Sequence, residues 1–371
     1  MGHQADFLRD FRGDTIHPST LELMHELGLL DEFLKLPHSR VERLSGQVGE
    51  TTITLADFSH LPTHCKFIAL MPQWDFLDFL AAHGKRYPNF DLRMRAEATD
   101  LIEQGGRVAG LRAKTPDGEL EIRADLVVGC DGRHSTLRER AGFQVESLGA
   151  PMDILWFRMP RHPGDTSETF GHMEAGMMMV MLNRNDYWQC AYVIPKGGID
   201  RVKAKGLAAF RDSIAFMSPF LRDRLDEIKD WDDVKLLTVA VDRLPRWHRP
   251  GLLCIGDAAH AMSPIGGVGI NLAIQDAVAA ANILVVQLRE GRVTEALLEA
   301  VQQRRTMPMR VIQWLQIQIQ NNVLSAVLGS TARPKPPFAA KFLNWFPVLR
   351  RIPARLIGLG VRPEHIHTPQ A

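Results

Sequence analysis

Short apolar runs that stop at an acidic or glycine-rich turn are the most regular feature of the chain. The run Leu252 to Ile255 predicts a buried strand that ends at Gly256-Asp257. The loop that follows contains Pro264, Gly266, Gly267 and Gly269. Apolar residues at helical spacing then predict a long helix from about Asn271 to Leu288. The pattern places a carboxylate at a strand tip, ahead of a glycine loop and a helix N-terminus.

A second strand that ends in a carboxylate is predicted before residue 131. Three strand-like runs precede it, 92–98, 107–114 and 119–128, with Gly105-Gly106 and Asp117-Gly118 between them. These short turns predict an antiparallel meander. The last run leads to Asp131-Gly132, and Ser135 can cap the helix that follows. Two strand tips with a carboxylate and glycines are therefore expected.

The first 90 residues predict two helices, an extended middle and a third helix. Ser19 is a candidate N-cap for a helix that ends at Gly28, and a short helix is expected over 31–36. Residues 41–58 show period-two stretches typical of strands. Pro72 stands where a further helix begins.

Residues 151 to about 245 change character and predict a second, antiparallel domain. Strand-like runs cover 154–159, 176–182, 187–194 and 235–241, with a turn at 183–186 and a helical segment at 202–225. One cluster in this region is apolar and adaptable, namely Met177, Met178, Met179 and Met181 with Trp188. Such a set either lines a pocket or belongs to the core, and core is the more frequent outcome.

Composition and charge narrow the class of partner. The 371 residues are 45% apolar and 23% charged, as in a globular enzyme of one or two domains, and 44 Lys and Arg balance 43 Asp and Glu. This balance gives no reason to expect nucleic acid as a partner. The four cysteines form no CxxC pair, the histidines show no metal-ligand spacing, and neither a secretory signal nor an 18-residue apolar run is present. We expect a cytoplasmic protein without a metal site.

The strand tip at Asp257 has a chemistry of its own. A carboxylate there can accept hydrogen bonds from a polyol, glycines allow close backbone approach, and a helix N-terminus stabilises a developing anion. The alternative is an ordinary strand-to-helix turn with Asp257 as a cap. The order of strand, Gly-Asp, proline, glycine loop and helix over 25 residues favours a binding site.

These residues resemble a known family. Gly256-Asp257-Ala258-Ala259-His260, with Pro264 and Gly266-Gly267-Val268-Gly269-Ile270-Asn271, is similar to the GD motif of the class A flavoprotein monooxygenases, the p-hydroxybenzoate hydroxylase type. The resemblance implies that Asp257 contacts the ribityl chain of FAD. It also implies that the loop from Pro264 to Asn271, with Gly266, Gly267, Gly269 and Ile270, lies along the isoalloxazine ring.

Three further strings carry the resemblance over nearly the whole chain. The string RGDTIHPST implies that Arg12 lies against the FAD pyrophosphate, and PQW implies that Gln73 contacts the ribityl or phosphate region. Asp131 and Gly132 resemble the DG motif, found where FAD and the nicotinamide cofactor approach each other. Taken alone, each string has a plain alternative: a solvated arginine, an exposed glutamine and a helix cap.

The implied fold is α/β, a Rossmann-like FAD-binding domain with an antiparallel-sheet substrate domain. The expected segments are 1–150 and 246–330 for the FAD-binding domain, with an inserted extended segment at 41–70, then 151–245 for the substrate domain and 331–371 for a basic amphipathic tail. The GxGxxG unit that opens such a domain is missing, because the chain enters the family pattern about one βαβ unit late. We therefore expect an N-terminally truncated domain.

The implied function is hydroxylation of an aromatic or other apolar small molecule by molecular oxygen, through a flavin hydroperoxide, with FAD as cofactor and NADPH or NADH as reductant. We assign no catalytic acid or base, because the cofactor supplies this chemistry. Two alternatives remain: a cofactor-deficient homologue without hydroxylase activity, and a flavin-dependent reductase of prenyl lipids.

The tail and the helix before it suggest partners. Residues 331–371 combine Lys and Arg with Phe and Trp, a composition that suits weak contact with an anionic membrane surface. The same segment can instead pack on the parent domain or at a homodimer interface. A long helix over 302–328, rich in Gln and Ile, is also a candidate partner-facing element, and Pro308 is expected to interrupt or start it.

Overall fold

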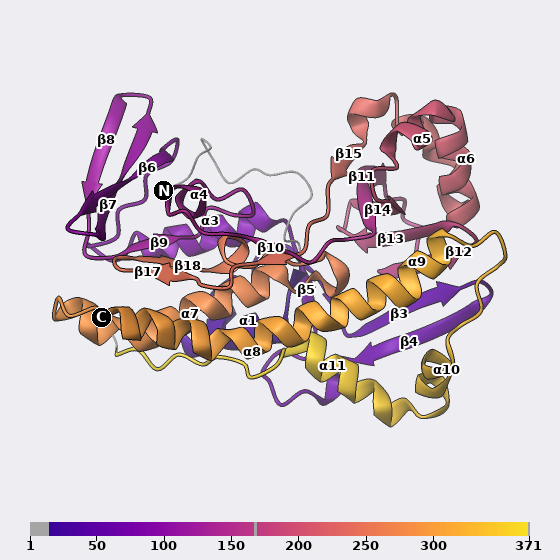
Figure 1. The fold of residues 1–371 in the computed structure, drawn as a ribbon. Coiled ribbons are helices and arrows are strands. Elements are labelled where there is room, and N and C mark those ends of the chain that lie inside the picture. The colour runs from indigo at the N-terminus through magenta and orange to yellow at the C-terminus, as the bar shows by residue number, and fades with distance from the viewer. Residues whose placement is uncertain (1–14, 167–168, 370–371) are drawn as a thin grey trace.

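The computed structural model describes residues 15–166 and 169–369 and shows a mixed α/β fold (Figure 1). Three small sheets and the helices around them form one half of the molecule. Their strands are β1 (Thr15–Ile16), β2 (Ser39–Val41) and β5 (Ile68–Leu70); β9 (Val127–Gly129), β17 (His248–Arg249) and β18 (Leu252–Cys254); and β6 (Glu97–Gln104), β7 (Arg107–Thr115) and β8 (Gly118–Arg123). The pair β18 and β9 is parallel, with Leu253 opposite Val128. Their carboxyl ends therefore point to the same edge.

A seven-stranded sheet forms the other half, in the order β15-β11-β14-β13-β12-β3-β4. Its strands are β3 (Arg43–Val48), β4 (Thr51–Asp57), β11 (Met152–Pro160), β12 (Phe170–Glu174), β13 (Met177–Asn183), β14 (Tyr187–Pro195) and β15 (Lys235–Leu237). All neighbours are antiparallel except β12 and β3. Residues 43–57 thus extend the sheet, which is not confined to 151–245. A separate two-stranded pair is formed by β10 (Glu146–Ser147) and β16 (Asp242–Arg243).

The two faces of the large sheet have different partners. The helices α5 (Ile199–Ala204) and α6 (Leu207–Met217) lie beside one face (Figure 1). Met179, Met181 and Trp188 are buried on that face, in one core cluster with α6. Met178 points to the opposite face, where it clusters with Ile265. The methionine stretch is therefore mainly core, as the more frequent alternative predicts, and Met178 is the exception.

Two long helices run side by side along the molecule (Figure 1). They are α7 (Gly269–Arg289) and α8 (Glu295–Ile319), and a π-helical turn (Gln320–Leu324) and α9 (Ser325–Leu328) continue α8. The expectation that Pro308 ends or starts a helix is wrong, because Pro308 lies inside α8. Residues on both sides of it, such as Val301 and Ile312, are buried in one cluster with α7 and β18, and this packing outweighs the lost backbone bond.

The segment Ile265–Arg289, which contains α7, has the length and hydropathy of a membrane span. In its most apolar 18-residue window 44% is buried inside the protein, and α7 contributes Leu272 and Leu284 to the core. Asp276, in the middle of the helix, is fully buried among charged partners. These features are typical of the core helix of a folded domain.

The N-terminal helices are α1 (Pro18–Glu26), α2 (Leu30–Phe33) and α3 (Gln73–Gly84), and α4 (Thr136–Arg140) follows β9. Pro72 precedes α3 as predicted, and Ser135 caps α4 by accepting a hydrogen bond from the Arg138 amide at 3.0 Å. The prediction that Ser19 caps α1 is wrong. His17 is the N-cap and Pro18 takes the first helical position, where its missing N–H is harmless.

Other predicted boundaries differ because local breaks intervene. The first run of the meander forms β6 at 97–104 rather than at 92–98, and the run 119–128 divides into β8 and β9, which belong to different sheets. The helical segment 202–225 divides at Gly206, whose φ is +87°, and at Pro219, after which the chain continues as a 3₁₀ helix (Pro219–Glu227).

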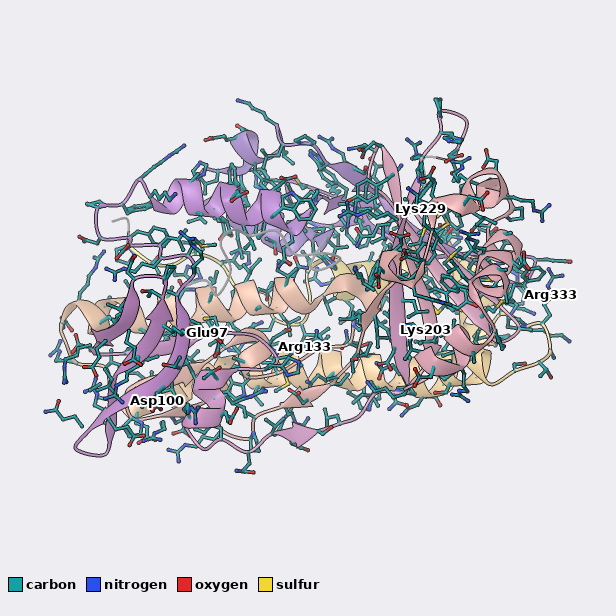
Figure 2. All side chains as sticks on the ribbon, turned by 90° about the horizontal axis from the view of Figure 1, so that it is seen from above. Glu97, Asp100, Arg133, Lys203, Lys229 and Arg333 are labelled. Atoms are coloured by element: carbon teal, nitrogen blue, oxygen red, sulfur yellow. The ribbon has the colours of Figure 1, made fainter. Side chains whose placement is uncertain are left out.

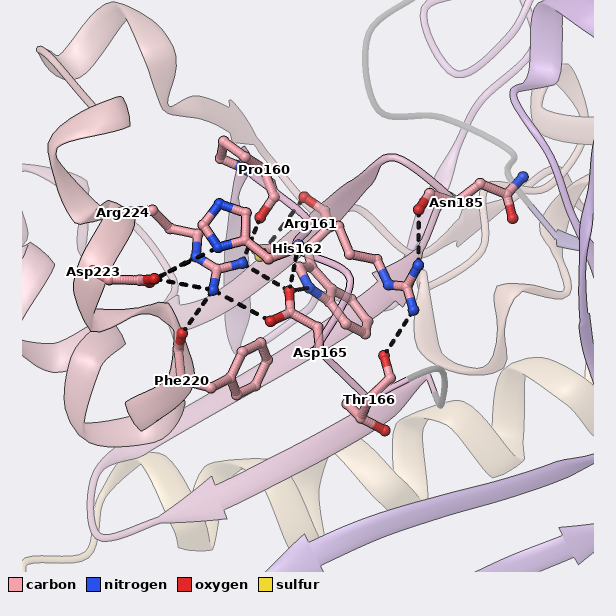
Figure 3. A network of polar contacts seen from close by, with 11 residues as sticks. Pro160, Arg161, His162, Asp165, Thr166, Asn185, Phe220, Asp223 and Arg224 are labelled. Carbon is pink, nitrogen blue, oxygen red and sulfur yellow. Dashed lines mark hydrogen bonds and ion pairs between the residues drawn. The ribbon is translucent and has the colours of Figure 1, made fainter.

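A buried ion pair holds that 3₁₀ helix over the sheet (Figure 3). Arg224 donates to both oxygens of the Asp165 carboxylate, at 2.7 and 3.2 Å, and Trp188 Nε1 donates to it at 2.9 Å. Arg224 also donates to the carbonyl of Pro160. The partners of each charge are complete, which fits a structural role for this network.

The C-terminal segment packs against the edge strand β4. It forms α10 (Phe338–Trp345), a 3₁₀ turn (Pro347–Arg350) and α11 (Arg351–Gly358), along the lower side of the molecule in Figure 1. Asn344 donates to the carbonyl of Thr52 at 2.8 Å and accepts from the amide of Thr54 at 3.2 Å. These bonds cover the backbone of the edge strand.

Candidate functional site

The two predicted strand tips meet at one edge, because β9 and β18 are parallel. The amide of Ile255 donates to the carbonyl of Gly129 at 3.0 Å, so the chains leave the sheet together. Asp131 follows β9, and Asp257 lies in the 3₁₀ turn after β18 (Gly256–Ala258). The topology thus brings together two strings that are more than 120 residues apart in the sequence.

Asp257 is the freer of the two carboxylates. Its side chain is 37% exposed, and within the described residues its one charged neighbour is Arg133, with Nη2 3.8 Å from Oδ2. Arg133 Nη1 donates to the Thr238 carbonyl at 3.1 Å, while its buried Nε has no hydrogen-bond partner in the part of the chain described. Figure 2 shows Arg133 near the centre of the molecule. A carboxylate acceptor and an unsatisfied guanidinium donor therefore stand side by side.

The Asp131 carboxylate differs from that of Asp257, because its hydrogen-bond partners lie within the protein. It accepts from the Ser135 hydroxyl and from the Leu137 amide, the latter at 3.1 Å, and so it caps α4. Gly132 has a φ of +87°, which allows the chain to turn toward Arg133. The alternative noted for this string, a helix cap, is the geometry observed, and the backbone of Asp131-Gly132 remains at the site edge.

The loop from Pro264 to Gly269 depends on its glycines. Gly256, Gly266 and Gly267 all have φ between +58° and +78°, where L side chains are strained. A Cβ on Gly267 would lie 2.3 Å from Thr15 Oγ1, whereas the nearest atom to a Cβ on the exposed Gly266 is 3.7 Å away. The loop is thus tightly packed against Thr15 at Gly267, whereas space remains beside Gly266. Pro264 precedes its 3₁₀ turn (Ile265–Gly267), and α7 starts at Gly269.

Asn271 ties the glycine loop to the start of the described chain. Its Oδ1 accepts from the His17 amide at 3.0 Å and from the Thr20 hydroxyl at 2.7 Å, and its Nδ2 donates to the carbonyls of Thr15 and Gly267. The Asn271 side chain thus makes all four of its possible hydrogen bonds inside the protein. Asn271 therefore positions the loop. Its neighbour Ile270 packs toward α1 and α3 in the N-terminal core cluster.

A buried ion network supports the Asp257 turn from below. Asp276 on α7 accepts from His260 Nε2 at 2.6 Å, from Arg305 Nε at 2.9 Å and from the Gly256 amide at 3.1 Å. Arg305 also donates to Glu364 at 3.1 Å. Burial alone would raise the pKa of the Asp276 carboxyl, but His260 and Arg305 together lower that pKa below its ordinary value. The ionised carboxylate thus fixes the backbone one residue before Asp257.

A row of glutamines on α8 and the π-helical turn holds the other side of the loop. Gln316 accepts from the Ser263 amide at 3.1 Å and donates to the carbonyls of Ser263 and Ile265, both at 2.9 Å. Gln320 donates to the Ser263 hydroxyl at 2.7 Å, and Gln313 donates to the Ala261 carbonyl at 3.2 Å. This face of the Gln-rich helix therefore serves the loop rather than a partner.

Two predicted site residues remain outside these contacts. Arg12 lies outside the described residues. Gln73 is half-buried at the start of α3, and within the described chain its side chain makes no hydrogen bond to the other predicted site residues. The helix itself packs toward the loop, since Phe76 shares a core cluster with Ile270 and Ile274 of α7.

Three contributors were missed in the sequence: Arg133, Asp276 and Gln316. Arg133 stands directly after Asp131-Gly132, so its proximity to Asp257 required only the parallel pairing of the two strands. Asp276 was an acidic residue inside an otherwise apolar helix, which is a signal for a buried partner. Gln316 was marked only by the spacing of Gln313, Gln316 and Gln320 on one helical face.

The chemistry of this edge fits the ribityl chain and ring of FAD. Asp257 offers an acceptor, the buried Arg133 Nε lacks a partner, and the backbone of Gly266 is open to a flat ligand. Ile265 of the loop belongs to an apolar cluster that also contains Met173 and Met178 of the large sheet and Leu324 and Leu328. Apolar side chains of the large sheet thus lie beside the glycine loop, as a site for an apolar substrate requires.

Comparison with known proteins gives consistent matches. The model of the family described as FAD binding domain matches residues 2–315. The 6-methylpretetramide 4-monooxygenase of Streptomyces rimosus is 31% identical over 351 residues, which are 94% of this chain and 83% of that protein. The rifampicin monooxygenase of Streptomyces venezuelae is 30% identical over 288 residues, 72% of this chain and 55% of that protein. The chain thus spans about half the length of the second relative.

Solved structures share the fold. The OxyS anhydrotetracycline hydroxylase of Streptomyces rimosus superposes with a TM-score of 0.72 at 20% identity, over 100% of this chain and 72% of that one. At this identity the likeness concerns the fold alone. The arrangement of the described elements is therefore an architecture already seen in solved structures.

Proposed function

This chain belongs to the FAD binding domain family of flavin-dependent aromatic monooxygenases, and on that premise we propose that it hydroxylates an aromatic small molecule with molecular oxygen. The observation that carries the proposal is the strand tip at Asp257, where a free carboxylate and Arg133 stand next to an open glycine loop. Through Ile265 the loop joins the apolar cluster that contains Met178 of the large sheet. The cofactor-binding side and the substrate-binding side of the proposed site are thus adjacent.

We assign the residues of this edge as follows. Asp257 accepts hydrogen bonds from the ribityl hydroxyls of FAD, the backbone of Gly266 and Gly267 lies along the ring, and Arg133 donates to the polar part of the cofactor. The loop is shaped and anchored by Pro264, Gly269, Ile270 and Asn271. The backbone of Asp131 and Gly132 forms the neighbouring edge of the proposed site. Arg12 and Gln73 remain proposed cofactor contacts. When bound, FAD supplies the electron transfer and oxygen activation, with NADPH or NADH as reductant.

The protein contributes positioning in this proposal. The Asp276 carboxylate and the Gln316 amide fix the two ends of the 256–265 segment from opposite sides. The positive end of α7 starts in the loop, at Gly269, and would stabilise negative charge on a bound flavin. The apolar side chains around Met178 would limit the access of water to the face of a bound flavin.

The first test is retention of the cofactor. Purified protein is incubated with excess FAD and gel filtered, and its visible absorption spectrum is recorded. The expected result is a retained flavin spectrum, followed by NAD(P)H oxidation and a product 16 mass units heavier with a polycyclic phenol of the kind the 6-methylpretetramide 4-monooxygenase name implies. A colourless protein with a folded circular dichroism spectrum would instead favour a cofactor-deficient homologue.

A matched pair of variants tests the assignment of Asp257. Asp257→Asn removes a charged acceptor, a loss worth about 1.5 to 3 kcal/mol, so the affinity for FAD should fall roughly tenfold or more. Asp117→Asn changes an exposed turn carboxylate and should bind FAD as the parent does. Equal affinity in both variants would remove Asp257 from the site.

Location and assembly remain proposals as well. We propose a cytoplasmic enzyme, in line with four free cysteines in the described chain. A homodimer has a candidate surface on α8, where Met307 and Trp314 are exposed. Light scattering of the purified chain tests this state directly.

A further inference from the structure

The C-terminal segment carries an exposed aromatic patch that neither the fold nor the proposed site uses. We define it as Phe338, Phe342, Trp345, Phe346, Val348 and Ile352, all exposed. The four rings touch in sequence: Phe338 contacts Phe342 and Trp345 with centroids 6.2 Å apart, and Phe342 contacts Phe346 at 4.6 Å. The four rings therefore form one continuous apolar surface, with Val348 and Ile352 exposed on the same segment, and surfaces of this kind mark interaction sites.

The orientation of α10 makes the exposure of this patch a fixed property. Asn344 is hydrogen-bonded to Thr52 and Thr54 of the edge strand β4. The face of α10 that carries Asn344 is therefore turned toward the protein. Phe338, Lys341, Phe342 and Trp345 follow the i, i+3, i+4, i+7 spacing and so share one face. The aromatic rings and one lysine thus project from the same surface.

The charge of the segment identifies the kind of partner. Residues 331–362 contain seven Lys and Arg and no Asp or Glu, whereas the whole chain has a formal charge of only +1. Lys335, Lys341, Arg351 and Arg355 are exposed, and none of them pairs with a carboxylate among the described residues. Arg333 differs, because it pairs with Glu50 and Glu174. Unpaired cations around aromatic rings fit a surface that is both anionic and apolar.

We propose that the aromatic patch docks the protein on an anionic lipid bilayer. Rings of Phe and Trp enter the boundary between head groups and acyl chains, while the surrounding cations meet anionic head groups. A second copy of the chain fits less well. A two-fold contact would place Lys341 and Arg351 of one copy against the same patch of the other, and like charges would repel. Docking would bring the enzyme to substrates dissolved in the bilayer.

The experiment is co-sedimentation of the full chain with large vesicles of phosphatidylcholine, with and without 30% phosphatidylglycerol. The double variant Phe338→Ser/Trp345→Ser removes two residues that are 71% and 64% exposed, so the fold should persist. Its matched control is Tyr87→Ser/Phe216→Ser, two aromatic residues outside the segment that are each 56% exposed. We expect binding of the parent to anionic vesicles only, a loss of at least about tenfold in partitioning for the first variant, and parent-like binding for the control.

Charge and assembly complete the test. Lys341→Glu should weaken binding and reduce its salt dependence, whereas Lys205→Glu, on the exposed end of α5, should not. The proposal is overturned if the parent does not sediment with anionic vesicles, or if both double variants lose binding equally. It is also overturned if light scattering shows a dimer that dissociates only in Phe338→Ser/Trp345→Ser, because the patch then belongs to a second copy. Melting temperatures of all variants verify folding.

Discussion

At the residue scale, His17 shows how a single buried group connects the site to the tail. It caps α1, its amide donates to Asn271, and its ring Nδ1 donates to the Ile357 carbonyl at 2.7 Å. Burial lowers the pKa of this imidazole to about 4, and the bond to Ile357 opposes only part of that effect. The folded protein therefore holds His17 neutral at pH values where the unfolded chain would protonate it.

The pH dependence follows from this difference. As the pH falls below 6.5, the ordinary pKa of histidine, His17 becomes protonated in the unfolded chain. In the folded chain it stays neutral until the pH reaches about 4. Stability from His17 is thus complete above pH 6.5 and is lost as the pH falls toward 4. Between pH 7.5 and 5.0 the parent should lose about 2 kcal/mol more than His17→Asn, which keeps a good N-cap. Urea unfolding at both pH values measures this, with His367→Asn, an exposed histidine, as control.

The two strand-tip aspartates mark the limit of sequence reasoning at this scale. Asp257 and Asp131 both follow a strand and stand beside glycine, and nothing in either string separates them. In the structure Ser135 and Leu137 saturate Asp131, whereas Asp257 accepts no hydrogen bond among the described residues and faces Arg133. The difference arises from the helix start four residues after Asp131, a local feature whose consequence for the carboxylate depends on a rotamer.

At the element scale, the glycine loop is held by close packing rather than by sequence alone. Gly267 and Gly291 have nearly the same positive φ, +64° and +65°. A Cβ on Gly291 meets nothing within 4 Å, whereas one on Gly267 meets Thr15 Oγ1 at 2.3 Å. The two positions therefore separate the cost of the left-handed backbone from the cost of the contact.

We predict that Gly291→Ala lowers the free energy of unfolding by about 1 kcal/mol, the backbone cost alone. Gly267→Ala should lower it by a further 1 to 3 kcal/mol, because β1 must move away from the loop. It should also reduce FAD retention, which Gly291→Ala should not. Denaturant unfolding and the absorption spectrum measure the two effects. If Gly267→Ala and Gly291→Ala have equal free energies of unfolding, Thr15 moves away from the added Cβ without a loss of stability.

The glutamine row gives a second prediction for the same loop. Gln316→Leu removes three hydrogen bonds to Ser263 and Ile265 while the helix propensity of α8 is retained. Unsatisfied backbone groups should then cost about 1 to 3 kcal/mol and loosen the loop, so that FAD binds several-fold more weakly. Gln318→Leu, on the exposed side of the helix, is the control. Unchanged FAD affinity in Gln316→Leu would show that the glycines hold the loop without α8.

At the scale of the whole molecule, the periodicities predicted the elements better than their partners. The meander, the hairpin at 183–186 and the helix after the glycine loop follow from spacing and turn residues, which act over a few positions. The joining of β3 to β12, far apart in the sequence, does not, because a strand with one polar face can pair with several edges. The sheet that faces the site is therefore the part that sequence reasoning left incomplete.

Adjacent methionines on β13 test how the two halves meet. Met179 is 1% exposed in the core under α6, whereas Met178 is partly exposed on the opposite face, in contact with the cluster of Ile265. Met179→Ala should destabilise the protein by about 2 to 5 kcal/mol and leave substrate preference unchanged. Met178→Ala should cost far less stability. Because it removes apolar volume from the cluster that Ile265 of the glycine loop joins, it should change the ratio of kcat/KM between a large and a small aromatic substrate about fivefold. If the two variants change this ratio equally, the substrate does not bind between the sheet and the loop, even where the protein retains FAD.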